Sequence, residues 1–497
     1  MERERIQSNK LSVVEKVGYS LGDFAANLVF QTLLTFLAFF YTNVFRIPAG
    51  AAAAIIFVVG MVGAFVFTPL VGLAADRTHT RWGMYRPWIL ATAIPLGILS
   101  LLTFTTPDLG PDGKLMYALA SYTLLVLAYV ANNLPYAALS GVITGEMKER
   151  NSLSAYRFVA VMLAQFAVQV LLLPLVLLVG GGDQARGFRL VMTAFAVIGT
   201  VFLIITFFAT RERVQPAPGS RATVATDLLD LRHNRPWLIM LAITVLVFIN
   251  LALKGGMYVY YFKYYLSAAS LQAFLGHMGY DSFVAGADAA ARHFGVASMH
   301  WPTDPATSAF SLFNAGGILA MICGIGCSKA LADRFGKRNV FGSALFASTL
   351  FLLAFFFFGP RAVDWVFVSY ICHGFFYGIT TPVLWTMTAD VADYSEWRTG
   401  RRATAVTFSA MLCGLKAGLS IGGALVAGIL AVSGFDAGAT VQAPAVTHAV
   451  RLAVSIVCSV PFLASVALLY WYEIDKPMES RIEADLGQRR RQLEAEA

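Results

Sequence analysis

Four charged side chains lie inside long apolar stretches of this 497-residue sequence: Asp23, Arg157, Lys254 and Lys416. A charge at the centre of a bilayer costs roughly 2.5–3.5 kcal/mol on insertion scales, so each one indicates a functional site if these stretches span a membrane. A buried carboxylate such as Asp23 can exchange a proton when its surroundings change. Arg157 carries the planar fork that binds a carboxylate through two hydrogen bonds. The set predicts binding or ion-coupling chemistry at membrane depth.

A polar stripe begins at Asp23 and continues every four residues through Asn27, Gln31 and Thr35. That spacing puts the four side chains near one face of a helix. Because lipid would reject such a face, we expect it to line water or a partner. Hydrogen bonding between neighbouring helices is the alternative.

Two adjacent amides, Asn132 and Asn133, precede Pro135 in another apolar stretch. Proline removes a backbone donor and loosens the helix at this depth. Amides both donate and accept hydrogen bonds, as sugar hydroxyls do. Tyr136 and Trp385 could stack on a sugar ring. These residues complete the predicted substrate-binding set of Asp23, Asn27, Gln31, Asn132, Asn133, Tyr136, Arg157, Lys254, Trp385 and Lys416.

The elements that must position these groups are membrane-spanning helices. Hydrophobic residues make up 58% of the chain and charged residues 13%, against about a quarter in soluble domains. Spans need roughly 20 mostly apolar residues. Twelve are predicted, at about 17–43, 50–75, 86–106, 115–144, 153–179, 189–210, 237–267, 307–331, 339–359, 363–390, 404–433 and 449–472. We therefore expect an all-α membrane protein.

The basic residues predict the topology. Most of the 37 Lys and Arg fall at the termini or in loops on the same side as the termini. The positive-inside rule then places both termini in the cytoplasm. We expect the spans to lie in the cytoplasmic (inner) membrane. It also accounts for the net charge of +8 without nucleic acid as a partner.

The chain divides into two similar parts. A middle loop at 211–236 separates 1–210 from 237–472, and a tail follows at 473–497. "GLAADR" (72–77) ends the second span as "KALADR" (329–334) ends the eighth. Two parallel six-helix halves with a midplane substrate site are the arrangement of major facilitator transporters. An extracytoplasmic insertion at 268–306 holds His277, His293 and His300, whose spacing suits no compact metal motif.

Several blocks resemble one family in particular. They are "GYSLGDFAANLVF", "DRTHTRWGMYRPWIL", "NLPYAALSGVITGEMKERNSLSAYRF", "YVYYFKYYL" and "ADVADYSEWRTGRR". With them the chain resembles the glycoside–pentoside–hexuronide:cation symporters, which include the melibiose carrier, over most of residues 17–472. A similar pattern also occurs in animal lysophospholipid carriers.

The resemblance implies sugar transport coupled to a cation. It matches Asp23, Arg157 and Lys416 to charged positions of the family, and it matches Asn133 to an aspartate that holds the sugar. The two carboxylates of the family's sodium site fall on Ala64 and Thr68 here, so sodium at that site is not expected. A proton is the expected coupling ion, with Asp23, Arg157 and Lys416 as the coupling residues.

The loop blocks predict a gate at the cytoplasmic ends of the helices, where charge pairs would stabilise the outward-open state and break as the halves rock. The alternative is that these charges only determine topology. The predicted gating residues are Asp76, Arg77, Arg81, Arg86, Glu146, Asp333, Arg334, Lys337, Arg338, Asp390 and Asp393.

The cavity charges do not balance, since one acid faces three cations if all four groups line the cavity. Either one lysine is neutral or the substrate supplies a negative charge, as a hexuronide or uronate would, and we favour the second.

The rival functions are a lysolipid or amphiphile carrier, an uncoupled sugar uniporter and a non-transporting scaffold. Neither a nucleotide-binding loop nor a hydrolytic triad is found, so no enzyme is predicted. We expect no metal, cofactor, disulfide or obligate protein partner. The expected partners are a small sugar and membrane lipid.

Overall fold

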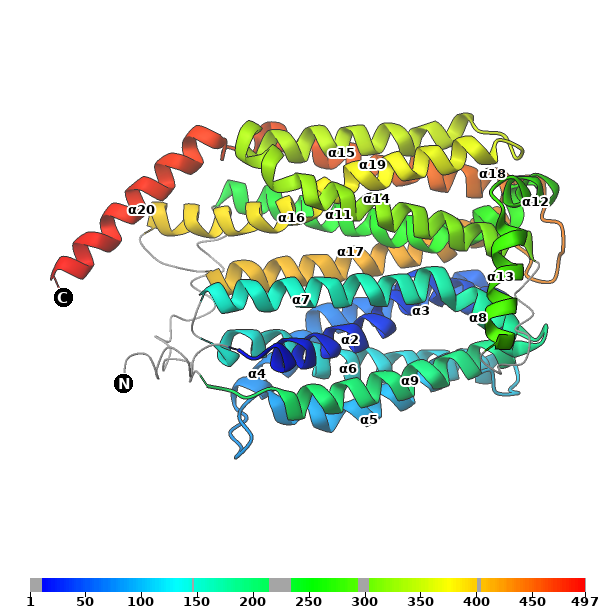
Figure 1. The fold of residues 1–497 in the computed structure, drawn as a ribbon, viewed down its shortest axis with the longest axis horizontal. Helices are drawn as coiled ribbons and strands as arrows, with labels where there is room; N and C mark the ends of the chain where they lie inside the picture. The colour runs from blue at the N-terminus through cyan, green and yellow to red at the C-terminus, as the bar shows by residue number, and fades with distance from the viewer. Residues whose placement is uncertain (1–10, 145–146, 214–233, 294–303, 400–403, 497) are drawn as a thin grey trace.

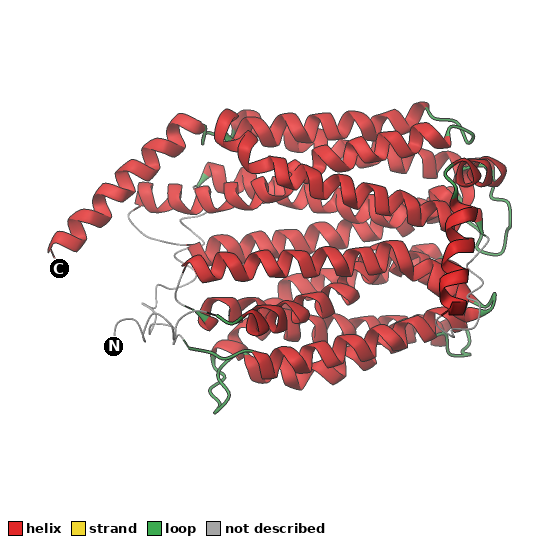
Figure 2. Ribbon diagram, in the orientation of Figure 1, coloured by secondary structure: helices red, strands yellow, loops and turns green. Residues whose placement is uncertain are grey.

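The computed structural model describes residues 11–144, 147–213, 234–293, 304–399 and 404–496. Over these residues the chain forms helices joined by loops, with no strand element (Figure 2). Twelve helical stretches are long and apolar enough to cross a membrane, and each coincides with one of the twelve spans expected from the sequence. The all-α, twelve-helix architecture is therefore confirmed.

Short π-helical turns interrupt several spans. The first six spans consist of α2 (Val13–Phe39) with η1 (Phe40–Val44), α3 (Ala49–Val62) with η2 (Gly63–Phe67) and α4 (Thr68–Asp76), α5 (Arg86–Thr103), α6 (Pro111–Ile143), α7 (Met147–Phe166) with η3 (Ala167–Leu171) and α8 (Leu172–Gly180), and α9 (Gln184–Ala209).

The last six spans follow α9 in the sequence, with two short helices inserted after the first of them. The two short helices are α12 (Ala268–His277) and α13 (Tyr280–His293). The six spans consist of α11 (Arg235–Tyr260) with η4 (Tyr261–Tyr265), α14 (Pro305–Phe335), α15 (Lys337–Ala354) with the 3₁₀ turn η5 (Phe355–Phe357), α16 (Val363–Thr399), α17 (Thr404–Ser433), and α18 (Pro444–Leu452) with η6 (Ala453–Val457), α19 (Cys458–Leu468) and the 3₁₀ turn η7 (Leu469–Trp471). A final helix, α20 (Lys476–Glu496), leaves the bundle.

Local capping begins several of these helices. The side chains of Asp183, Asn234 and Asp304 accept hydrogen bonds from backbone N–H groups in the first turns of α9, α11 and α14. Such caps satisfy donors that a helix N-terminus otherwise leaves unpaired. Helix α16 runs nine residues past the predicted end of its span, at 390. Within this helix, Asp390 pairs with Lys337 of α15.

The two sets of helices lie side by side in Figure 1, with α17 and α7 in the middle of the bundle. The start of α2 and the end of α20 lie at one end, which we call the termini end, and α12 and α13 lie at the other, the insertion end. The expected insertion therefore includes two helices, while 294–303, with His300, lies outside the described residues.

Polar and aromatic contacts join the halves at the insertion end. The hydroxyls of Thr42 and Tyr260 are 2.6 Å apart, and the Asn43 amide donates to the Tyr264 hydroxyl at 2.5 Å. Phe39 packs edge-on against Tyr260. At the termini end, none of the ion pairs formed among the described residues joins one half to the other. Polar contacts thus join the halves at the insertion end, whereas these ion pairs at the termini end lie within one half.

Glycines let α14 and α16 pack closely. A Cβ atom at Gly324 would collide with the carbonyl of Phe375, and one at Gly378 with that of Met321. Small residues at such contacts let two helix backbones approach in the membrane, where packing drives association. This close packing positions His373 of α16 in the interior of the second half, where it is 1% exposed.

Candidate functional site

Asp23 and Arg157 form a buried ion pair between α2 and α7. Arg157 Nε lies 2.8 Å from Asp23 Oδ2, and the Asp23 side chain is 8% exposed. The Asn27 amide donates to the Asp23 carbonyl at 2.9 Å and to Oδ1 at 3.3 Å. Breaking such a pair by removing one partner typically costs about 3–5 kcal/mol. Two of the three residues predicted to couple transport, Asp23 and Arg157, are in direct contact, whereas Lys416 contacts Thr68.

Two tyrosines support this pair. Tyr19 and Tyr136 stack with ring centroids 4.6 Å apart, and each hydroxyl donates to the other's carbonyl, at 3.0 and 2.8 Å. The Arg157 guanidinium lies 5.7 and 5.5 Å from the two centroids, within cation–π range. Tyr19 covers one face of Tyr136, and Tyr136 is 1% exposed, so the ring is not open to a sugar in this arrangement.

The polar stripe on α2 continues as a chain of amides towards η3. Gln169 donates to Gln31 at 3.1 Å, and Gln165 donates to Gln169 at 3.4 Å. The Thr35 hydroxyl is buried and has no hydrogen-bond partner in the described part of the chain. The stripe therefore combines contacts between helices with one unpartnered polar group.

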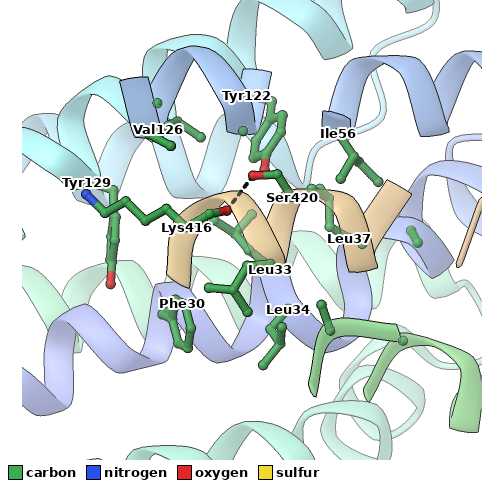
Figure 3. Close-up of a pocket in the computed structure, with 18 of the residues that line it drawn as sticks. Phe30, Leu33, Leu34, Leu37, Ile56, Tyr122, Val126, Tyr129, Lys416 and Ser420 are labelled. Carbon is green, nitrogen blue, oxygen red and sulfur yellow. Dashed lines mark hydrogen bonds between the residues drawn. The ribbon is translucent and has the colours of Figure 1, made fainter. Parts of the chain in front are cut away.

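Lys416 lies at the interface of the halves. Its ammonium donates to the Thr68 hydroxyl at 2.7 Å, which joins α17 to the start of α4. It also lines a cavity of about 120 Å³ between α2, α3, η2 and α6 on one side and α11 and α17 on the other. Figure 3 shows the Lys416 side chain running past Tyr129, with Phe30, Leu33, Leu34 and Leu37 of α2 on the facing wall. The cavity thus has apolar walls and one cationic group.

A second polar centre contains a residue that was not predicted from the sequence. Lys254 Nζ lies 2.7 Å from His373 Nε2 and 4.4 Å from the centroid of the Tyr377 ring. His373 Nδ1 lies 2.8 Å from the Ser348 hydroxyl. Lys254 is 7% exposed. The signal that could have identified His373 is an imidazole within an apolar span of α16.

The two asparagines have different surroundings. Asn132 is fully buried, and its amide donates to the Thr92 hydroxyl of α5 at 2.8 Å. This contact fastens α6 to α5. Asn133 and Trp385 are partly exposed. A role for any of these residues in substrate binding stays a prediction.

The predicted gating residues make contacts within their own halves. Lys337 Nζ lies 2.7 Å from Asp390 Oδ1 and 2.6 Å from Glu479 Oε1. Arg338 donates to the carbonyls of Leu469 and Tyr470, at 3.1 and 3.2 Å. These bonds tie the termini ends of α15, α16, η7 and α20 together.

The loop between α4 and α5 is held by an acid that was not predicted. Glu212 accepts hydrogen bonds from the backbone N–H groups of Met84, Tyr85 and Arg86 at 2.8, 2.8 and 3.0 Å. The Arg86 side chain donates to the Phe207 carbonyl at 2.7 Å. Glu212 therefore fixes this loop against the end of α9.

The neighbouring Arg213 binds Glu15 through two hydrogen bonds of 2.6 and 2.9 Å. These bonds raise the pKa of Arg213. A further pair, Lys16 with Glu149, joins α2 to α7 at 2.9 Å. Both pairs hold helices of the first half together at the termini end.

The remaining predicted gating residues make no ion pair among those found in the described residues. The guanidinium of Arg81 lies over the Trp82 ring and that of Arg334 over the Phe335 ring. The backbone carbonyls of Asp333 and Arg334 accept from Lys476. Arg77 is the C-cap residue of α4, and Asp393 is a partly exposed residue of α16. Glu146 and the side chain of Asp76 lie outside the described residues. A gating role for this set stays a prediction.

The fold and these buried charges define a membrane transporter with two six-helix halves. The family model described as MFS/sugar transport protein matches residues 18–291 and 303–476, so the chain belongs to this family of the major facilitator superfamily. The protein is accordingly a multi-pass membrane transporter and not an enzyme. The resemblance to glycoside–cation symporters found in the sequence is confirmed.

Curated relatives match nearly the whole chain. It is 35% identical to the "putative glycoside/cation symporter YagG" of Escherichia coli (strain K12), covering 96% of this chain and 94% of that protein. It is 33% identical to the "inner membrane symporter YicJ" of the same organism, covering 94% and 93%. It is 31% identical to the isoprimeverose transporter of Lactiplantibacillus pentosus, covering 99% and 94%.

Solved structures support the fold alone. A D-xylose–proton symporter superposes with a TM-score of 0.55 at 12% identity, covering 93% of this chain and 96% of the other. An inward-facing bacterial homologue of the human lysosomal transporter Spinster superposes with a TM-score of 0.62 at 14% identity, covering 93% and 97%.

Proposed function

We propose that this protein moves a sugar or glycoside across the cytoplasmic membrane by alternating access, in symport with a proton and with both termini in the cytoplasm. The Asp23–Arg157 ion pair is the observation that carries the proposal. A buried carboxylate within reach of a cation can hold either that cation or a proton, and transport can alternate between the two. Two of the relatives are named for glycoside or isoprimeverose transport, which supports a sugar as the substrate.

The surroundings of Lys416 support a proton over sodium. Its ammonium lies 2.7 Å from Thr68, and Ala64 lines the same cavity. These are the positions that correspond to the sodium carboxylates of the family. A hard cation needs several oxygen ligands, and an ammonium beside them would repel it. Sodium coupling at this place is therefore disfavoured.

An anionic sugar is the finer proposal within this class. Arg157 is paired with Asp23, which leaves Lys254 and Lys416 without a carboxylate partner among the described residues. A hexuronide or uronate would supply the missing negative charge. One relative, 29% identical over 93% of this chain, is named a glucuronide carrier protein homolog.

The test is alkalinisation of a lightly buffered suspension of de-energised cells that express the protein. Neutral glycosides, glucuronides and free uronates are added one at a time, and uptake is followed with labelled sugar. Alkalinisation by any of them supports proton symport, and a response to uronides alone also supports the anionic substrate. Labelled uptake without alkalinisation overturns the proton coupling and favours an uncoupled uniporter. Uptake of a labelled lysolipid and of no sugar would overturn the sugar proposal.

A further inference from the structure

The strongest unassigned feature is the contact between two basic side chains, Lys254 and His373, deep in the second half. Their nitrogens are 2.7 Å apart, a hydrogen-bond distance. Two protonated groups cannot form such a bond because each would offer only donors. The contact therefore requires that one nitrogen accept.

The other side of the imidazole identifies the acceptor. His373 Nδ1 lies 3.1 Å from the backbone carbonyl of Ser348, which can only accept a hydrogen bond. Nδ1 also lies 2.8 Å from the Ser348 hydroxyl, which donates to the His373 carbonyl at 3.3 Å and can therefore accept from Nδ1. A proton on Nδ1 satisfies both contacts, and in a neutral ring Nε2 is then the acceptor for the Lys254 ammonium. A second proton on the pair would place an N–H group on Nε2 facing the ammonium. The pair thus carries one positive charge at most.

No carboxylate lines the cavity beside this pair, within the described part of the chain. The cavity measures about 50 Å³. Facing groups are Thr35 of α2, Gln165 of α7, Gln169 of η3, Tyr258 of α11, Asn314 of α14, and Tyr370 and Tyr377 of α16. Cys458 of α19 is a further titratable group near Lys254. The titratable groups among these are three phenols and a thiol, all neutral in their ordinary state near neutral pH.

The cavity also offers hydrogen-bonding capacity to water. The hydroxyls of Thr35 and Tyr258 line it, are each 2% exposed and have no partner among the described residues. A cavity needs about 10–15 Å³ for each water it holds, so this one has room for a few. Water in contact with Lys254 could accept a proton from its ammonium.

The pair lies where the halves meet. Its cavity has α2, α7 and η3 of the first half on one side and α11, α14 and α16 of the second on the other. Rocking of the halves would change how much water reaches an ammonium that has no opposite charge beside it. Since a buried unpaired charge is costly, that change alters the balance between the ammonium and the neutral amine.

We infer that Lys254 and His373 form a proton-binding site separate from Asp23, which takes up and releases one proton in each transport cycle. On release, the Lys254 ammonium gives H⁺ to water in the cavity, and the charge of the pair falls from one to zero. The His373–Ser348 contact holds the imidazole so that its Nε2 faces the lysine. This inference rests on the proposed proton symport.

The experiment measures protons moved per sugar in proteoliposomes that contain the full chain. Isoprimeverose and methyl glucuronide serve as the neutral and anionic probes, and labelled counterflow reports folding and exchange. Lys254→Met removes the charge, whereas Lys254→Arg keeps a charge that cannot leave. His373→Gln retains an acceptor for the ammonium but cannot titrate. Lys263→Met is the matched control, because Lys263 lies on the same span against Phe39 and Tyr264, away from the pair.

We expect Lys254→Met and Lys254→Arg to move one proton fewer per sugar than the wild type, whatever their rate of counterflow, because the ratio is taken per sugar moved. His373→Gln should displace the pH profile of uphill uptake, and Lys263→Met should match the wild type. An unchanged stoichiometry in both Lys254 variants would overturn the inference and leave the proton symport standing. A wild type that moves either sugar without protons would overturn both.

A second measurement needs no sugar. In detergent, the ε-carbon NMR resonance of Lys254 in lysine-labelled protein, assigned through Lys254→Arg, should move between its charged and neutral positions as the pH is raised through the neutral range. A resonance that keeps its charged position throughout would contradict the inference.

Discussion

The two halves share a topology, but their buried charges differ in kind. In the first half, Asp23 and Arg157 carry opposite charges and satisfy each other at 2.8 Å. In the second half, Lys254 faces the imidazole of His373 at 2.7 Å, with no carboxylate beside it in the described residues. An ion pair can persist in a membrane interior, whereas a cation without a counter-ion must lose its proton, meet an anion or be hydrated. The comparison indicates that the first centre can exchange a proton only when its ion pair opens, whereas the second can exchange charge as it stands.

The first centre nevertheless contains the only carboxylate placed within the predicted binding stripe. If the ion pair opens during the cycle, Asp23 becomes a proton acceptor and the two centres act in sequence. The predictions below test whether the difference between the centres holds.

The largest effect is expected from Asp23→Asn, which should cut uphill accumulation of the labelled sugar to what the proton carried by Lys254 and His373 can drive, while downhill exchange remains. The amide retains hydrogen bonding to Asn27 and Arg157 but can neither bind a proton nor balance the guanidinium. Accumulation and counterflow in energised and de-energised vesicles check this. Asp183→Asn is the control, since it removes the same charge from a helix cap that asparagine also serves. An Asp23→Asn protein that moves as many protons per sugar as the wild type would remove Asp23 from the coupling mechanism.

A large difference in stability should separate the two centres. Arg157→Met leaves Asp23 buried without its partner, and the expected loss is about 3–5 kcal/mol in the free energy of unfolding. Lys254→Met instead removes a cation that has no carboxylate partner, so its effect should be near zero or stabilising. Thermal unfolding in detergent compares the two. Equal losses in the two variants would show that both charges contribute alike to stability. The double variant Asp23→Asn with Arg157→Met should recover part of the stability that Arg157→Met loses.

An intermediate effect is expected where Lys416 crosses between the halves. Thr68→Asp would place a carboxylate beside the ammonium, which now lies 2.7 Å from the Thr68 hydroxyl. The new ion pair should favour the present arrangement of the halves and slow transport about tenfold, which corresponds to about 1.4 kcal/mol. Initial rates of labelled uptake measure the effect. Thr68→Asn is the uncharged control. If the aspartate variant transports sugar as fast as the asparagine variant, an ion pair between Lys416 and residue 68 does not slow transport.

Much of the fold could be predicted because membrane spans follow from hydropathy and length alone. Asp23, Arg157, Lys254 and Lys416 could also be found, since charge in an apolar span is a strong signal. His373 was missed because a single imidazole in a span resembles an ordinary core residue until its neighbours are known. Its partners come from α11 and α15, so the contact with Lys254 and Ser348 exists only after three helices pack.

Other features of the site depend on contacts that no local pattern contains. Asn132 donates to Thr92, forty residues earlier in the sequence. Glu212 holds the loop at Met84–Arg86 but stands in the sequence as one more charge in a polar loop. Spacing along one helix predicts which residues share a face. It does not predict which neighbouring helix that face meets.

The smallest effect is expected at the insertion end, where the hydrogen bonds between the halves involve neither charge centre. Tyr260→Phe removes one hydrogen bond to Thr42, which keeps its other contacts with Ala38 and Asn43. A typical intramolecular hydrogen bond contributes about 1 kcal/mol, so the closed arrangement of this end should lose roughly fivefold in population. Labelling of a cysteine placed at Phe36 from the insertion side would report the opening.

The matched control is the next residue along the chain. Tyr261 is as buried as Tyr260, but its hydroxyl has no partner among the described residues, so Tyr261→Phe should leave the labelling rate unchanged. If Tyr260→Phe also changed the proton stoichiometry, the insertion end would be coupled to one of the charge centres. If it changed only the labelling rate, then opening and proton exchange are separable, and the contrast between the two centres concerns charge alone.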